Sequence, residues 1–357
     1  MIRMKRYAPN WRLTGMNDVL WYEEPLDMED FVAGGSLLLV AMFSIALYII
    51  ILRTMRKHDK EIVGYRFLIS AGVCDILLLI NYGVWPGLTI LFKSEIISKP
   101  LRHWMQLYLD WAWFSMVWHY SLIAWSRWSA IRHPIDFRSQ ARKTSYMLCS
   151  FCYIISLIQV LCTHFQPWYV TFYYDPSSYG MLAEDFDLYM SGGQSAMFLG
   201  FHIIAIIPPC IFYNWSLILL IRRRRNSVIT STPIAHLHNN IESRLLLPCV
   251  INLIMFVFGQ VLITYGTGEG KWAGWTVMML FCTNSSINTA LLLVCSASIR
   301  QQVYKTLGVR CSSAYPQKHE AMIFRNNMAI GNESKMALEL DTGIANNPLN
   351  NETTVFV

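Results

Sequence analysis

The sequence predicts an all-α membrane protein, a bundle of seven transmembrane helices. Three observations predict it: the chain is unusually apolar, its apolar residues fall in seven long runs, and its cations collect beside one set of loops. Of the 357 residues, 54% are hydrophobic and 15% charged, whereas soluble domains carry about 25% charge. The net charge of +6 does not indicate nucleic acid as a partner, because the cations flank apolar runs and form no single stripe.

Each apolar run is long enough to cross a bilayer as a helix, which takes about 20 residues. Helices are expected because lipid offers no hydrogen bonds to an open backbone. The runs form one membrane domain over residues 31–299, preceded by a polar segment over residues 1–30. The predicted spans are 31–52, 67–91, 104–126, 145–165, 196–221, 245–265 and 275–298.

The distribution of lysine and arginine predicts the orientation, because cytoplasmic loops are enriched in both. The loops on one side hold eighteen of them and the opposite loops hold four. The eighteen are Arg53, Arg56, Lys57, Lys60, Arg66, Arg127, Arg132, Arg138, Arg142, Lys143, Arg222, Arg223, Arg224, Arg225, Arg244, Arg300, Lys305 and Arg310. The loop over residues 166–195 has acidic residues and no cation. We therefore expect a multi-pass protein of the plasma membrane, with the N-terminus extracellular and the C-terminus cytoplasmic.

The chain beyond the seventh span predicts a short amphipathic helix and a tail. Over residues 300–311, apolar residues recur at four-residue spacing from Ile299 to Leu307, which is typical of a helix lying in the membrane interface. Cys311, at its end, is a candidate for reversible palmitoylation, with a free cytosolic thiol as the alternative. Residues 312–357 are rich in Asn, Ser and Thr and predict a disordered cytoplasmic tail.

The cytoplasmic end of the predicted third span carries a motif. It reads Ser126-Arg127-Trp128-Ser129-Ala130-Ile131-Arg132-His133-Pro134-Ile135-Asp136-Phe137. This resembles the signature of rhodopsin-class G-protein-coupled receptors, Asp-Arg-Tyr followed by Leu-Ala-Ile-Val-His-Pro-Leu-Arg-Tyr, with Arg, Ala-Ile and His-Pro in register. The resemblance implies that Arg127, between Ser126 and Trp128, is the switch that contacts the G protein when the sixth helix moves outward.

The seventh and second spans carry the same resemblance. The segment Asn-Ser-Ser-Ile-Asn-Thr-Ala-Leu-Leu over residues 284–292 is similar to the family's Asn-Ser-x-x-Asn-Pro-x-x-Tyr, and Asp75 resembles its mid-membrane aspartate. The resemblance implies that Asp75 joins Asn284, Ser285 and Asn288 around a water or sodium ion. An intramembrane carboxylate needs such partners. The cluster is either a conformational switch or a static polar contact between helices.

Several features of the family are missing. Ser126 replaces the acidic residue before the arginine, Thr289 replaces the seventh-span proline, and the sixth span has no Cys-Trp-x-Pro. The external cysteine pair is also absent, because Arg102 stands twenty-five residues before Arg127 and the loop over 166–195 contains no cysteine. Such changes resemble those of divergent nematode serpentine chemoreceptors and orphan receptors.

An aromatic helix face with one carboxylate predicts a candidate ligand pocket. Asp110, Trp113 and Phe114 share one face of the third span near its outer boundary, a setting that suits a ligand from outside. No amine ligand is inferred, because the family's amine-binding aspartate falls one residue earlier. His202 and Gln260 are expected in the outer halves of the fifth and sixth spans. The alternatives are an interfacial Asp110 bound to water, and helix-to-helix hydrogen bonds for His202 and Gln260.

The residues leave two function classes open. No enzyme is expected, because no metal-spaced His/Cys cluster, phosphate loop or nucleophile motif occurs; no metal site is predicted either. We expect a receptor that transmits an extracellular chemosensory, peptide or small-molecule signal to a heterotrimeric G protein. A transporter or ligand-gated channel is the alternative, because Asp75 and the polar seventh helix could line an ion path. That alternative predicts an inverted repeat, and none is visible in the sequence.

Overall fold

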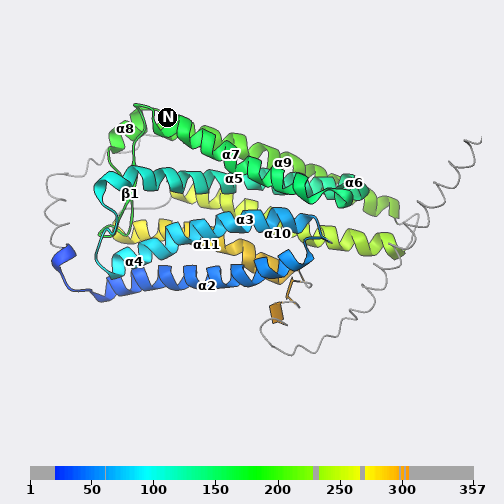
Figure 1. Cartoon of the computed structure of the whole chain (residues 1–357), viewed down its shortest axis with the longest axis horizontal. Coiled ribbons are helices and arrows are strands. Elements are labelled where there is room, and N and C mark those ends of the chain that lie inside the picture. Colours follow the sequence, from blue (N-terminus) through cyan, green and yellow to red (C-terminus); the bar gives the residue numbers. More distant parts are fainter. Residues whose placement is uncertain are drawn as a thin grey trace, which may run out of the picture. The chain divides into compact units, whose positions relative to one another are not determined.

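A computed structural model describes residues 21–60, 62–227, 233–265, 270–296, 299–300 and 303–304. Within them the chain is mostly helical (Figure 1). The elements are α2 (Met28–His58), α3 (Gly64–Leu79), the π-helix η1 (Ile80–Val84), α4 (Trp85–Leu91), the 3-10 helix η2 (Lys99–Leu101), α5 (Arg102–Arg132), α6 (Pro134–Ser139), α7 (Arg142–His164), β1 (Phe172–Asp175), β2 (Gly180–Ala183), α8 (Phe186–Ser191), α9 (Gln194–Ser227), α10 (Pro233–Tyr265) and α11 (Lys271–Cys295).

Each predicted span overlaps a long helical segment: α2, α3 with η1 and α4, α5, α7, α9, α10 and α11, in chain order. Helix α7 ends at His164, one residue before the predicted 165, and α11 ends at Cys295, before the predicted 298. These segments run side by side in Figure 1. Five of them are long and apolar enough to cross a membrane: Met28–His58, Gly64–Leu91, Arg142–His164, Gln194–Arg222 and Lys271–Val294. The apolar part of α10, Leu246–Leu262, is shorter.

Helix α5 is the least apolar of the long helices for a structural reason. It packs against α3, α7, α9 and α10, so its polar side chains face other helices. Asp110, His119 and Arg127 are all buried there. A central helix does not need an apolar surface toward lipid, because intramembrane polar groups are tolerated where they meet protein partners.

The second span is interrupted by a π-turn. The N–H of Trp85 donates to the carbonyl of Ile80, five residues back, and Pro86 follows with no N–H to donate. A proline inside a helix removes an intrahelical bond and distorts the preceding turn. The widened turn contains Asn81, a buried polar residue, and π-turns occur often at functional sites.

The all-α prediction was wrong for the loop over residues 166–195, which contains an antiparallel hairpin. Strand β1 pairs with β2 from Phe172↔Ala183 to Asp175↔Gly180. The Asp175 carboxylate accepts hydrogen bonds from the backbone N–H groups of Ser177 and Ser178, and such side-chain bonding closes a tight turn. In Figure 1 the hairpin and α8 lie at the α4 end of the bundle, opposite α6. We call these the hairpin end and the Arg127 end.

The buried core has two main parts. One surrounds Phe67 and Ala124 toward the Arg127 end, and the other surrounds Trp113 and Phe256 toward the hairpin end. The first also includes Ile299 and Val303, which are two of the apolar residues that the sequence places at four-residue spacing. The remainder of the predicted helix 300–311, Cys311, the tail over 312–357 and residues 1–20 lie outside the described residues.

Candidate functional site

Asp75 is the centre of a buried polar cluster in the middle of the bundle. Its Oδ2 lies 2.7 Å from the hydroxyl of Tyr48 on α2 and 3.2 Å from Nδ2 of Asn288 on α11. The Tyr48 hydroxyl also lies 2.7 Å from the backbone carbonyl of Ser285. One phenol carries a single hydrogen, so the Tyr48 hydroxyl donates to one of these two oxygen atoms at a time. The cluster thus joins α2, α3 and α11.

The predicted members of this cluster divide into two groups. Asn288 bonds to Asp75 as expected, and Ser285 takes part through its backbone carbonyl. Asn284 instead approaches the hydroxyl of Tyr120 on α5, as does Asn252 on α10. These polar residues therefore come from five helices: α2, α3, α5, α10 and α11. Tyr48 and Tyr120 were missed in the sequence because a tyrosine in an apolar run reads as one more hydrophobic residue.

Arg127 is buried at the end of the bundle opposite the hairpin. Its side chain is 2% exposed, and its Nε and Nη2 atoms have no hydrogen-bond partner. Tyr213 on α9 and Cys249 on α10 lie close enough to interact with its charge. Within the described part of the chain, no carboxylate lies within ion-pair distance of Arg127. The guanidinium is therefore shielded by helices α9 and α10 and is poorly satisfied there.

The two residues beside Arg127 make their contacts elsewhere. The Ser126 hydroxyl donates to the carbonyl of Ile123 at 2.7 Å, so it completes its own helix turn. The Trp128 ring packs on Phe212 and Trp215 of α9, with ring centroids 5.7 and 6.0 Å apart. Trp128 therefore packs α5 against α9, and its ring nitrogen, like Nε and Nη2 of Arg127, is buried without a hydrogen-bond partner among the described residues.

A second cluster at the Arg127 end holds the short loops together. Asp59, which follows α2, is paired with Arg142 at the start of α7 and accepts a hydrogen bond from Tyr146 at 3.2 Å. Arg66 donates to the carbonyls of Asp59 and Gln140, each at 2.9 Å. The sequence shows these residues only as loop cations and one acid, so their pairing was not predictable.

Three of the predicted pocket residues do come together near the hairpin end. The Trp113 ring N–H donates to Nε2 of His202 on α9 at 2.9 Å, and Nδ1 of His202 lies 2.7 Å from the carbonyl of Phe198. The Phe114 ring lies 5.7 Å from the His202 ring. These side chains pack tightly against one another. They form a contact between α5 and α9, which agrees with the helix-to-helix alternative for His202.

Asp110 does not join that group. Its carboxylate accepts hydrogen bonds from Nε2 of Gln106 at 2.8 Å and from the hydroxyl of Tyr169 at 3.0 Å, and it lies 2.9 Å from Nε2 of His164. These partners belong to α5, the end of α7 and the loop that follows it. Asp110 thus anchors the loop in place of facing a pocket. Gln260 lies on α10 and does not line the cavity found at this end.

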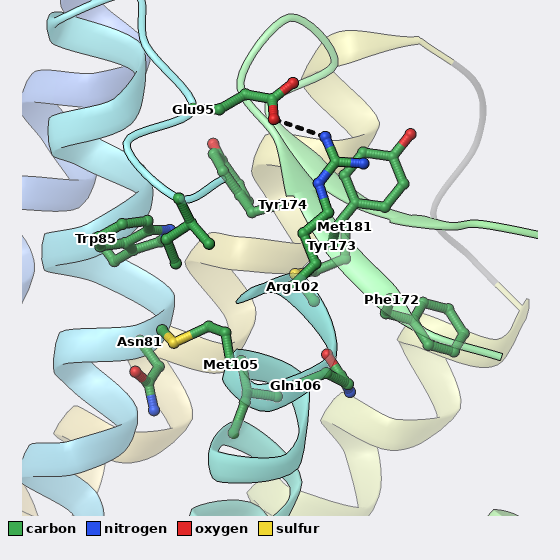
Figure 2. Close-up of a pocket in the computed structure, with 12 residues that line it drawn as sticks. Asn81, Trp85, Glu95, Arg102, Met105, Gln106, Phe172, Tyr173, Tyr174 and Met181 are labelled. Carbon is green, nitrogen blue, oxygen red and sulfur yellow. Dashed lines mark hydrogen bonds and ion pairs between the residues drawn. The ribbon is translucent and has the colours of Figure 1, made fainter. Parts of the chain in front are cut away.

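A small cavity opens at the hairpin end between α3–α4, α5 and the hairpin (Figure 2). Its volume is about 40 Å³. The described residues that line it are Asn81, Trp85, Glu95, Ile97, Arg102, Met105, Gln106, Leu109, Phe172, Tyr173, Tyr174 and Met181. None of the predicted pocket residues is among them. The sequence could not place this cavity because part of its wall comes from the π-turn and the hairpin, which were not predicted.

The hairpin is attached to the bundle by side chains and without a disulfide. Arg102, at the position where the resemblance would have a cysteine, lies with Cζ 3.9 Å from the Tyr173 ring centroid. The Tyr179 hydroxyl donates to Asp30 on α2 at 2.5 Å, and Lys93 pairs with the same carboxylate at 2.9 Å. Burial, followed by the hydrogen bond to Asp30, raises the pKa of Tyr179, so the phenol keeps its proton and remains a donor.

Comparisons with known proteins agree with this geometry. The chain is similar to squid rhodopsin, with a TM-score of 0.66 over 85% of each chain and 12% sequence identity, which shows the seven-transmembrane fold. No curated protein has significant sequence similarity to the chain. Residues 37–309 match the family described as "Serpentine type 7TM GPCR chemoreceptor Srv". This match favours a receptor over the transporter or channel alternative, and it confirms the predicted chemoreceptor resemblance. The chain therefore belongs to the Srv family of serpentine seven-transmembrane G-protein-coupled chemoreceptors.

Proposed function

We propose that this receptor binds an extracellular ligand at the hairpin end and activates a heterotrimeric G protein at the Arg127 end. The observation that carries the proposal is the buried Arg127 guanidinium, 2% exposed with two unpartnered nitrogens. A buried cation with unmet hydrogen bonds is held at a free-energy cost. A helix movement that uncovers Arg127 is favoured if a partner protein supplies acceptors, because a partner shifts the equilibrium toward the state it binds.

The ligand signal has a physical route to Arg127. Trp113 and His202 join α5 to α9 near the hairpin, and Asn284 and Asn252 bring α11 and α10 to Tyr120 on α5. Rotation or outward movement of α10 would remove Cys249 from Arg127. Coupling through packed helices with two arrangements is a general mode of switching.

The experiment measures ligand-evoked G-protein activation in cells that express the full chain. A panel of small alcohols, ketones, carboxylic acids and amines serves as the probe. Arg127→Ala should abolish the response at equal surface expression. Arg132→Ala is the matched control, because Arg132 is an exposed arginine near the same helix end, and it should retain most of the response. An unchanged response in Arg127→Ala, or a ligand-evoked current that needs no G protein, would contradict the proposal.

We propose the orientation from the cation distribution, with the N-terminus outside and the tail in the cytoplasm. Two glycosylation sequons in the tail, Asn332-Glu333-Ser334 and Asn351-Glu352-Thr353, give a direct test, because glycosylation occurs on the extracellular side. Expression with microsomes should leave both unmodified. Glycan addition to either asparagine would show the tail on the other side and would overturn the G-protein proposal as well.

We also propose that a water molecule or a sodium ion completes the Asp75 cluster. The Ser285 hydroxyl and the Asn284 amide oxygen have no hydrogen-bond partner although both atoms are buried, and carboxylate, hydroxyl and amide oxygens are suitable ligands for a hard cation. Replacing sodium by potassium in the buffer should lower the thermal stability of the wild type and leave Asp75→Asn unchanged if sodium binds. Equal stability of the wild type in both salts would favour water.

A further inference from the structure

The Arg102 guanidinium lies in the wall of the cavity at the hairpin end. The face of the group stacks on the Tyr173 ring, while Nη2 pairs with Oε2 of Glu95 at 2.6 Å. Figure 2 shows the Glu95–Arg102 pair on the loop side of the cavity. Stacking uses the face of a guanidinium and leaves its in-plane N–H groups for acceptors. Arg102 can therefore hold an anion without leaving Tyr173.

Glu95 is a replaceable partner for Arg102. Its side chain is 35% exposed, against 14% for Arg102, so it can return to water when displaced. It meets the guanidinium through one nitrogen, whereas a free carboxylate can bind two parallel N–H groups. Its other recorded hydrogen bond, from the hydroxyl of Tyr22, is long at 3.4 Å. A ligand carboxylate can compete for this position.

The backbone around Glu95 is strained. Lys93 has a φ of 45° and Ile96 a φ of 50°, and a β-branched residue in this region is a clear outlier. Strained conformations of this kind persist when surrounding contacts impose them. The Glu95–Arg102 pair and the Lys93–Asp30 pair are such contacts. Displacement of Glu95 would thus let the backbone from Lys93 to Ile96 relax. Ligand binding would then change the conformation of this loop.

The cavity beside the ion pair suits a short apolar chain. Trp85, Met105 and Met181 provide apolar walls next to Arg102 (Figure 2). A water molecule needs about 10–15 Å³ by this kind of measure, so about 40 Å³ corresponds to a body of only a few carbon atoms. The acidic Asp175 and Glu184 of the loop over residues 166–195 oppose anion capture, and salt screens exposed charges beyond about 8–10 Å.

We propose that Arg102 recognises a small carboxylate ligand with a short apolar chain, and that Glu95 holds the Arg102 guanidinium in the ligand-free receptor. This inference rests on the proposed function, since it names the ligand class of the same receptor. The ligand carboxylate replaces Glu95 on Arg102, and its apolar chain packs against Trp85. Release of the loop then follows from the loss of the Glu95 contact.

Direct binding to the purified full-length receptor in lipid nanodiscs tests the proposal. The probes are propanoate and butanoate, with propanol, methyl propanoate and propylamine as matched compounds. We expect ligand-detected NMR to show binding of the two acids and weak or no binding of the others. Arg102→Gln should abolish acid binding. Glu95→Gln should lower the Kd for both acids about tenfold, because it removes the internal competitor. Arg132→Gln is the control for loss of one arginine.

Two outcomes overturn the inference: acid binding that Arg102→Gln leaves intact, or alcohol and ester binding as strong as acid binding. An unchanged Kd in Glu95→Gln overturns it as well. If Arg102→Gln fails to fold, Arg102→Lys and Glu95→Gln decide the matter. Lysine offers no bidentate geometry and should weaken acid binding.

A further comparison separates this inference from the proposed function. Arg127→Ala should bind butanoate with the wild-type Kd and fail to activate the G protein. If the wild type binds acids through Arg102 and activates no G protein, the ligand class stands and the proposed function fails. If alcohols or amines activate the G protein and no acid binds, the proposed function stands and the ligand class fails.

Discussion

Buried charge is satisfied at Asp30 and Asp110 near the hairpin and left unsatisfied at Arg127 near the other end of the bundle. At the hairpin end, Asp30 and Asp110 are both buried and both have several donors around them. At the other end, Arg127 is buried to the same degree, and two of its nitrogens have no partner. Satisfied buried charges make a site rigid, whereas an unsatisfied one makes its surroundings easy to rearrange. The comparison teaches that the contacts of Asp30 and Asp110 hold the hairpin loop on the bundle, whereas the helices around Arg127 can rearrange.

The largest effect should come from breaking the hairpin end at Asp110. Asp110→Ala leaves Gln106, His164 and Tyr169 without their shared acceptor, and each buried unpaired donor is costly, so we expect a loss on the order of 3 kcal/mol. The apparent Tm of the purified receptor should fall by several degrees. Asp136→Ala is the control, because that carboxylate on α6 is exposed. Equal Tm values in the two variants would show that Asp110 is not an anchor.

Giving Arg127 the acid that it lacks should have the next largest effect. Ser126→Asp places a carboxylate beside the guanidinium and should stabilise the closed arrangement by about 1.4 kcal/mol, which is a tenfold change in an equilibrium. Ligand-independent G-protein activation should fall accordingly. Ser126→Asn has nearly the same shape without the charge and should change little. Higher basal activity in Ser126→Asp would mean that Arg127 needs no partner in the closed state.

Removing one donor from the hairpin anchor should have a smaller effect. Tyr179→Phe keeps the ring contact with Trp272 and loses the hydrogen bond to Asp30, at a cost of about 1 kcal/mol. Backbone hydrogen exchange over β1 and β2 should accelerate. Because the pKa of Tyr179 is raised, the phenol stays protonated and the wild-type exchange pattern should show no loss of this anchor up to about pH 9. An exchange rate that Tyr179→Phe does not change would remove this contact from the anchor.

At the Arg127 end, Gly64→Ala should have a still smaller effect. A Cβ at Gly64 would lie 2.8 Å from Nη1 of Arg127, so the guanidinium must shift, at low cost because it is the end of a flexible side chain. We expect basal G-protein activation to rise about twofold, which is a few tenths of a kcal/mol. Gly35→Ala is the matched control, since a Cβ there meets open space. Equal effects of both alanines would indicate helix propensity alone.

The smallest effect should be that of a reducing agent. The loop over 166–195 contains no cysteine, and the hairpin is held by Arg102, Asp30 and Asp110 through noncovalent contacts. Dithiothreitol should therefore leave hydrogen exchange over β1 and β2 unchanged. A faster exchange in the reduced receptor would indicate a covalent constraint elsewhere that reaches the hairpin.

The seven helices and the Asp75–Asn288 contact were predictable for different reasons. Apolar length alone determines a helix in lipid, since no other backbone arrangement satisfies its hydrogen bonds there. The contact between Asp75 and Asn288 followed from the family resemblance. The hairpin was missed because its strands are four residues long, with no periodic pattern that a short loop segment could display. The role of Asp110 was also missed, because its partners His164 and Tyr169 lie more than fifty residues along the chain.

The sequence by itself determined the membrane bundle, the order of its helices and the residues that carry the family resemblance, because apolar length and motif spacing are properties of neighbours along the chain. Only the tertiary structure decided which charges are satisfied. Arg102 stacks on Tyr173, Asp30 receives Tyr179, and Arg127 receives no carboxylate among the described residues. These outcomes depend on which helices and loops meet in space, and the energy of a buried charge depends on the atoms within a few ångströms of it.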